Sequence, residues 1–98
     1  MQVKIYHNCS IQKYMEGYRD GDPLVLGLEL DINVASDIGV CEWAFNVLNA
    51  PENALDTWEQ TIAGIWRAQQ IPSLSVGDVV EVMGKRWSAD HTGWQEVN

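Results

Sequence analysis

The clearest structural signal in the sequence is the stretch Leu24-Val25-Leu26-Gly27-Leu28-Glu29-Leu30-Asp31-Ile32. Every even-numbered position in it is aliphatic, and both of its acids occupy odd-numbered positions. A repeat of two is typical of a β-strand that turns one face toward a core. We therefore expect residues 24–32 to form a strand whose even-numbered side chains point inward.

Strands are expected at both ends of the chain as well. Val3-Lys4-Ile5-Tyr6-His7 alternates apolar and polar residues, which favours a strand with Val3 and Ile5 facing the core. The segment 14–23 that follows is rich in Gly, Asp and Pro, and such turn formers end any regular element. Beyond Pro72 the composition turns to β, with strands expected at 79–83, 86–89 and 93–97 and a tight turn at Gly84-Lys85.

Two amphipathic helices are expected between these strands. Ser36 or Asp37 is the expected cap of the first helix, and the Pro of Asn-Ala-Pro at 49–51 stops it. Asn53, three residues before Asp56, is an N-terminal signal for the second. The expected apolar stripes, spaced by three and four residues, are Ile38, Cys41, Phe45 and Leu48 in the first helix and Leu55, Trp58, Ile62 and Ile65 in the second.

Together these elements predict an α+β fold, in which a small, mostly antiparallel sheet carries two packed helices and ends in a C-terminal β-meander. The chain has 98 residues, which leaves room for one core, so we expect a single α+β domain over residues 1–98. A hydrophobic content of 46% with five tryptophans is typical of a folded domain and not of a disordered chain.

The charge of the chain is strongly acidic and unevenly distributed. Its 14 acids and 6 bases give a net charge of -8, and no Lys or Arg lies between Arg19 and Arg67. Because binding to a phosphate backbone needs Lys and Arg, direct nucleic-acid binding is disfavoured. No apolar run approaches the roughly 20 residues that span a bilayer, and residues 1–4 do not resemble a signal peptide. We therefore expect a cytoplasmic protein with no membrane role.

Few residues suggest catalysis or metal binding. His7 and Cys9 lie two residues apart, so on a strand they would share a face, as a base and a nucleophile do. Together with Cys41 and His91 they supply the sulfur and nitrogen ligands that zinc takes, but no close C-x-x-C pair is present. We expect no catalytic site, no metal and no cofactor, and two reduced, partly buried thiols in place of a disulfide.

The tryptophans and acids suggest a protein-binding surface. Trp58, in its helix stripe, and Trp87 and Trp94, in the meander, are expected to pack in the core. Trp43 and Trp66 lie beside their helix stripes and are expected to be half-exposed. Tryptophan is enriched among the residues that contribute most to interface energy. The residues expected to form the protein-binding surface are Glu42, Trp43, Glu52, Asp56 and Glu59.

The stretch Ser73-Leu74-Ser75-Val76-Gly77-Asp78-Val79-Val80, with Trp94 sixteen residues after Asp78, resembles small proteins of unknown function carried by actinobacteria, their phages and plasmids. The similarity extends to a preceding helix that ends like residues 44–49, and the stretch is also similar to YodL-like domains of mobile elements. Where members often have a cysteine, this chain has Ala89. The motif suits a structural role, because the two serines can cap turns and Gly77-Asp78 can turn the chain. The resemblance implies an accessory protein of a phage or other mobile element, placed in the host cytoplasm.

We expect a non-enzymatic accessory protein that binds a host or phage protein with a basic surface. A narrower alternative is a nucleic-acid mimic that inhibits a host DNA-binding or defence enzyme, because a spread of carboxylates can compete for a basic groove. A further alternative is a small enzyme or ligand-binding domain that uses Arg86, Asp90 and His91 where the helices cross the sheet. The chain also suits a homo-oligomer that pairs through strand 24–32 or through the Trp-bearing helices.

Overall fold

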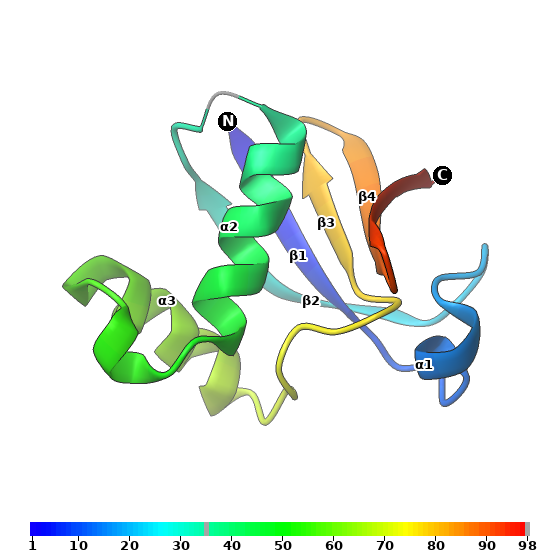
Figure 1. Ribbon diagram of the computed structural model, residues 1–98, viewed down its shortest axis with the longest axis horizontal. Helices are drawn as coiled ribbons and strands as arrows, with labels where there is room; N and C mark the ends of the chain where they lie inside the picture. Colours follow the sequence, from blue (N-terminus) through cyan, green and yellow to red (C-terminus); the bar gives the residue numbers. More distant parts are fainter. Residues whose placement is uncertain (35, 98) are drawn as a thin grey trace.

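The computed structural model describes residues 1–34 and 36–97 and shows a five-stranded antiparallel sheet with helices packed against it (Figure 1). The elements are β1 (Gln2–Asn8), α1 (Lys13–Glu16), β2 (Leu24–Asp31), α2 (Asp37–Asn49), the 3₁₀ helix η1 (Glu52–Ala54), α3 (Thr57–Ala68), β3 (Val79–Val82), β4 (Lys85–Asp90) and β5 (Gly93–Val97). The strand order is β2-β1-β3-β4-β5, and every neighbouring pair is antiparallel. The expected α+β fold with a C-terminal meander is confirmed.

One face of the sheet carries the core. In β1, the buried Val3 lies opposite Leu30 in β2 and Val82 in β3, and the buried Ile5 lies opposite Leu28 and Val80. The two long helices close over this face, with α2 against β3 and α3 against β2 (Figure 1). The β4–β5 hairpin extends the sheet beyond these two contacts. No helix in the described part of the chain is long and apolar enough to cross a membrane.

Helix α2 begins as expected but buries a different side. The Ser36 hydroxyl accepts the backbone N–H of Gly39 at 3.1 Å and caps the helix. The buried side centres on Ala44, whereas Ile38 and Phe45, expected in the core, are 38% and 44% exposed. A small residue at the centre of the buried side lets the helix backbone approach the sheet closely. The larger side chains are thereby turned to the flank of α2.

Helix α3 begins at a capping box and not at Asn53. The Asp56 carboxylate accepts the Glu59 backbone N–H at 2.8 Å, and the Glu59 carboxylate accepts the Asp56 backbone N–H at 3.2 Å. The helix buries Ile62, Ala63 and Trp66, whereas Trp58 and Ile65 of the expected stripe are about half-exposed. The buried side of α3 is therefore rotated by roughly a quarter turn from the expected one.

A β-bulge at Gly27 interrupts the repeat of two in β2. Ile5 pairs with Leu28 and Tyr6 pairs with Leu26, so Gly27 has no partner in the β1–β2 register. Paired residues point to the same side, so Leu26 lies on the Tyr6 face, opposite the core, and is largely exposed. The expectation that every even-numbered side chain of 24–32 points inward is therefore wrong before the bulge and right for Leu28 and Ile32, which are buried.

Trp66 occupies the space that the bulge leaves. Expected to be half-exposed, it is fully buried, and its indole Nε1–H donates to the Pro72 carbonyl at 2.9 Å. A Cβ atom on Gly27 would lie 2.4 Å from Cζ3 of the Trp66 ring. Gln69, just after α3, donates its side-chain N–H to the Gly27 carbonyl at 2.7 Å. The absence of a side chain at Gly27 therefore lets the end of α3 reach the edge strand.

Two local expectations differ from the structure in detail. The β3–β4 turn is formed by Met83 and Gly84, with φ of 51° and 84°, so Lys85 already belongs to β4. Two adjacent residues with positive φ are typical of the tight turns that suit the twist of a hairpin. Segment 14–23, expected to end regular structure, begins inside the helical turn α1, which ends at Glu16 and is capped by Gly17.

We predict opposite effects for alanine at two glycines. Gly27→Ala should lower the free energy of unfolding by about 1–3 kcal/mol, because the new methyl group overlaps the rigid Trp66 ring. Gly64→Ala, the matched control on the exposed side of α3, has open space and should raise that free energy by about 0.5–1 kcal/mol. Urea denaturation measures both, and equal stability of the Gly27 variant and the parent would refute the close contact.

Candidate functional site

A buried ion pair holds together the loops at one end of the sheet. The Asp78 carboxylate is fully buried. One of its oxygens accepts hydrogen bonds from the Lys13 ammonium at 2.7 Å and from the Asn8 backbone N–H at 2.8 Å. Its second oxygen accepts the Ser75 backbone N–H at 2.9 Å. Lys13 is only 2% exposed, so both charges have left water and each depends on the other.

This ion pair accounts for the motif at residues 73–80. The Asp78 backbone N–H donates to the Ser75 carbonyl, which closes a turn. Gly77 has φ of 90°, and a Cβ atom there would lie 2.6 Å from Cβ of Lys13. The motif therefore packs α1 against the start of β3, and the contacts of Asp78 agree with a structural interpretation of the stretch.

His7 lies beside the ion pair and not beside a nucleophile. Its Nδ1 is 3.3 Å from the Asp78 carboxylate and 3.5 Å from the Lys13 ammonium. Burial, reinforced by the Lys13 charge, lowers the pKa of His7 below its ordinary value, while Asp78 partly opposes this. Because β1 ends at Asn8, the alternation that placed Cys9 on the His7 face does not extend to Cys9, which is exposed.

The four residues considered for zinc occupy different surroundings. Cys41, on the buried side of α2, lies in the core, and its burial, together with the charges of Asp37 and Glu42, raises the pKa of its thiol to about 12. Both cysteines are free, but one is exposed and one buried, so the expectation of two partly buried thiols is wrong. Within residues 1–34 and 36–97, no three His, Cys, Asp or Glu side chains gather as metal ligands.

The structure joins two tryptophans on the outer surface of the helices. The Trp43 ring on α2 stacks on the Trp58 ring on α3, with centroids 5.6 Å apart and planes 30° from parallel. The Trp43 indole N–H donates to the Glu59 carboxylate at 3.1 Å, and Glu59 also belongs to the capping box with Asp56. Trp58, expected in the core, is 50% exposed and becomes part of the surface.

The helices that carry this tryptophan pair, and the turn between them, also carry exposed acids. Glu42, Glu52 and Asp56 are all exposed, on α2, on η1 and at the cap of α3. Of the expected binding residues, Trp43, Asp56 and Glu59 belong to one chain of contacts, which Trp58 completes. We call the set Glu42, Trp43, Glu52, Asp56, Trp58 and Glu59 the helix patch. Trp58 was missed from the sequence, because the capping box marks where α3 begins but not which of its sides is buried.

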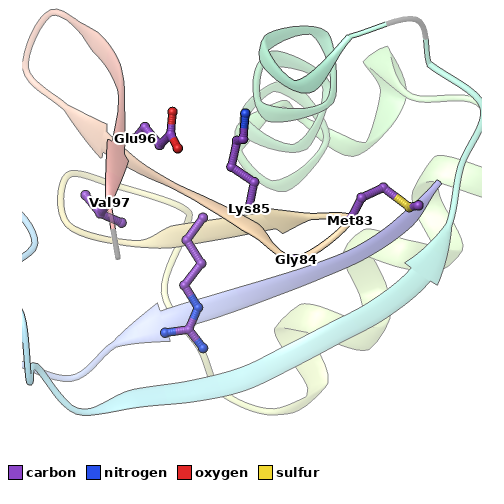
Figure 2. Close-up of a pocket in the computed structure, with 6 residues that line it drawn as sticks. Met83, Gly84, Lys85, Glu96 and Val97 are labelled. Atoms are coloured by element: carbon purple, nitrogen blue, oxygen red, sulfur yellow. The ribbon is translucent and has the colours of Figure 1, made fainter.

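The residues that the sequence offered for ligand binding do not line a single hollow of the surface. A hollow of about 460 Å³ lies at the β3–β4 turn, where Figure 2 shows Lys85 and Glu96 extending to the same side of the β4–β5 ribbon. Arg86 also lines this hollow, but its side chain turns to the other face, where it binds Glu81 at 3.0 Å. Asp90 and His91 line a different, smaller pocket. Arg86, Asp90 and His91 therefore do not share one site.

Comparison of the chain with protein-family models, with curated proteins and with solved structures finds no significant match.

We predict that the Lys13–Asp78 pair is strongly coupled. Asp78→Asn keeps the side-chain size but leaves a buried ammonium without its counter-charge, which should lower the free energy of unfolding by about 3–5 kcal/mol. Lys13→Met should also destabilise the fold. The double variant should lose less than the sum of the two, because neither charge is then left alone. Urea denaturation measures all three variants, and additive losses would contradict the pairing.

The lowered pKa of His7 predicts a loss of stability in mild acid. Below its ordinary value of 6.5, and above the lowered pKa, the unfolded chain binds a proton that the folded protein does not. Stability should therefore fall as the pH drops through this window, and His7→Gln should remove that part of the fall. Urea denaturation of both proteins above and below pH 6.5 tests this. Identical dependence of stability on pH in the two proteins would contradict a lowered pKa of His7 in the folded protein.

Proposed function

We propose that the protein is a non-enzymatic accessory protein that binds a basic protein surface through the helix patch. The observation that carries this proposal is the stacked Trp43 and Trp58 pair, in which Trp43 is partly buried and bound by Glu59 while Trp58 is half-exposed. In the described residues, no hydrogen bond joins a histidine ring to a Ser, Thr or Cys side chain, and His7 contacts the buried Lys13–Asp78 pair, so the geometry supports binding better than nucleophilic catalysis.

The tryptophan pair is suited to binding because it is already ordered. Trp58 stacks on a ring that is itself fixed by a hydrogen bond, so a partner loses little additional side-chain entropy by covering it. In the described part of the chain the Trp58 indole N–H has no acceptor, so it can donate to a partner. An aromatic anchor with a free donor is typical of residues that dominate interface energy.

The charge around the pair selects a basic partner. The helix patch lies within the part of the chain, between Arg19 and Arg67, that has no Lys or Arg. A field of one sign steers an oppositely charged protein and repels an acidic one. The phage or mobile-element setting is supported by the resemblance of residues 73–80. A nucleic-acid-mimic role is the narrower form of the same proposal, in which the partner surface normally holds DNA.

We predict that the charge of the helix patch controls binding. The variant Glu52→Gln/Asp56→Asn/Glu59→Gln removes three charges, yet Asn still caps a helix and Gln still completes a capping box, so α3 should persist. Tagged parent and variant are incubated with actinobacterial lysate treated with nuclease, over a salt series, and captured proteins are identified by mass spectrometry. A stoichiometric basic partner should be lost from the variant and, for the parent, with rising salt.

The matched control removes three charges elsewhere. Asp20→Asn/Glu29→Gln/Glu96→Gln changes exposed acids outside the helix patch and should retain the partner. Trp58→Ala should weaken binding at full charge, because it removes the exposed anchor. Equal loss of the partner from both charge variants would refute a local surface, since only net charge would then matter. Competition by duplex DNA for the same partner would identify the nucleic-acid-mimic form.

A further inference from the structure

Residues 10–21 form a loop that carries α1 at one end of the sheet, apart from α2 and α3 (Figure 1). The Cys9 backbone N–H donates to the Pro23 carbonyl at 2.8 Å, which joins the two ends of the loop. In the described part of the chain, the hydrogen bonds that connect this loop to anything beyond residues 8–23 all come from the Lys13 ammonium. We call residues 10–21 the α1 strap.

The α1 strap is held by a charge and not by apolar burial. Across residues 10–21, which the structure describes throughout, Lys13 is the only buried side chain, because the buried Gly17 has none. The large apolar side chains point to water, since Ile11 is 93% exposed and Met15 86%. Burial of such a side chain would contribute about 1.5–3 kcal/mol, and the strap lacks this contribution. Its attachment therefore depends on the ion pair between Lys13 and Asp78.

His7 is placed to bind the same carboxylate oxygen as Lys13. Its Nδ1 lies 3.3 Å from Asp78 Oδ1, which accepts the Lys13 ammonium at 2.7 Å. A shift of roughly half an ångström would give Nδ1 a charge-assisted hydrogen bond of ordinary length. The imidazole is 17% exposed, so a proton can reach it from solvent. The charged groups that face His7 are Asp78 and Lys13, whereas β2 places the uncharged Val25 opposite it.

Protonation of His7 makes it a competitor of Lys13. Neutral Nδ1 can accept a hydrogen bond from the ammonium 3.5 Å away, but protonated Nδ1 can only donate. The buried site would then hold two positive charges and one negative charge, which is unfavourable. His7 belongs to β1 and cannot leave, whereas Lys13 lies on the strap. If Lys13 leaves, the Asp78 carboxylate still has a cation and keeps the backbone N–H groups of Asn8 and Ser75.

We propose that the α1 strap is a pH-sensitive element: protonation of His7 displaces Lys13 from Asp78 and releases residues 10–21, while the sheet and the long helices stay folded. The proposal does not rest on the helix patch. His7 binds a proton more tightly once the Lys13 charge is gone, so acid favours the released state. The lowered pKa of His7 in the closed state places the release below pH 6.5. Release exposes the buried Asp78 turn to solvent.

NMR of the intact ¹⁵N-labelled protein can follow the strap and the sheet separately. Backbone order parameters of the α1 strap and hydrogen-exchange protection factors of β1 and β3 are measured from about pH 7.5 to about pH 5. As the pH falls, the order parameters should drop from about 0.85 to below about 0.6, while β1 and β3 stay protected. His7→Gln should keep the strap rigid over this range. His91→Gln, the matched control at the exposed histidine, should leave the transition unchanged.

Lys13→Met tests the exchange of cations directly. Without the ammonium, His7 is the cation that remains for Asp78, so the pKa of His7, read from its ring signals, should rise from below 6.5 to above it. A His7 pKa that stays below 6.5 in the folded variant overturns the exchange. If this variant does not fold, the comparison of His7→Gln with His91→Gln still decides.

Three further results would overturn the release of the strap. The first is loss of protection in β1 and β3 together with the strap, because the whole protein then unfolds. The second is a strap transition that persists in His7→Gln, because another group then controls it. The third is a strap that stays rigid in the parent down to about pH 5. None of these results bears on binding by the helix patch, which the lysate experiment tests at full charge.

Discussion

The buried ion pair between Lys13 and Asp78 is the constraint on which the rest of the structure depends. Burial of either charge alone costs several kcal/mol, and the pair is tolerated because backbone N–H groups fill the remaining acceptor sites of the carboxylate. The same carboxylate joins the end of β1, helix α1 and the turn before β3. The register of β3 against β1, and hence the core face, is fixed from this point.

The strands, the cap of α2 and the order of the strands and long helices could be predicted from the sequence because they depend on local rules. The orientation of the helices could not. In α2 the buried side centres on a small residue, Ala44, whereas in α3 it centres on Trp66, whose ring fills the space beside Gly27. Close approach of the α2 backbone to the sheet therefore outweighed the burial of Phe45, and the burial of Trp66 outweighed that of Trp58. A sequence pattern records which residues are apolar, but not how near the helix will lie.

The acids of the candidate site could be predicted from the sequence, but its most exposed aromatic residue could not. The acids and Trp43 follow from the sequence, since a run without Lys or Arg is visible there. Trp58 follows only from the rotation of the helices. Trp66 was expected at the surface but is buried. The glycine that makes room for its ring, Gly27, is distant in the sequence and falls within a stretch that the sequence predicts as a regular strand. Contacts between distant segments decided which tryptophans face outward.

The bulge at Gly27 also bears on how the sheet meets other sheets. β2 is an edge strand with no Lys or Pro, and it carries exposed Val25 and Leu26, which are features of strands that recruit a further strand. The bulge breaks the regular row of backbone groups, and Gln69 already occupies the carbonyl at that point. Growth of the sheet by edge-to-edge addition, the first step of aggregation for many β proteins, is thereby interrupted at the middle of its longest strand.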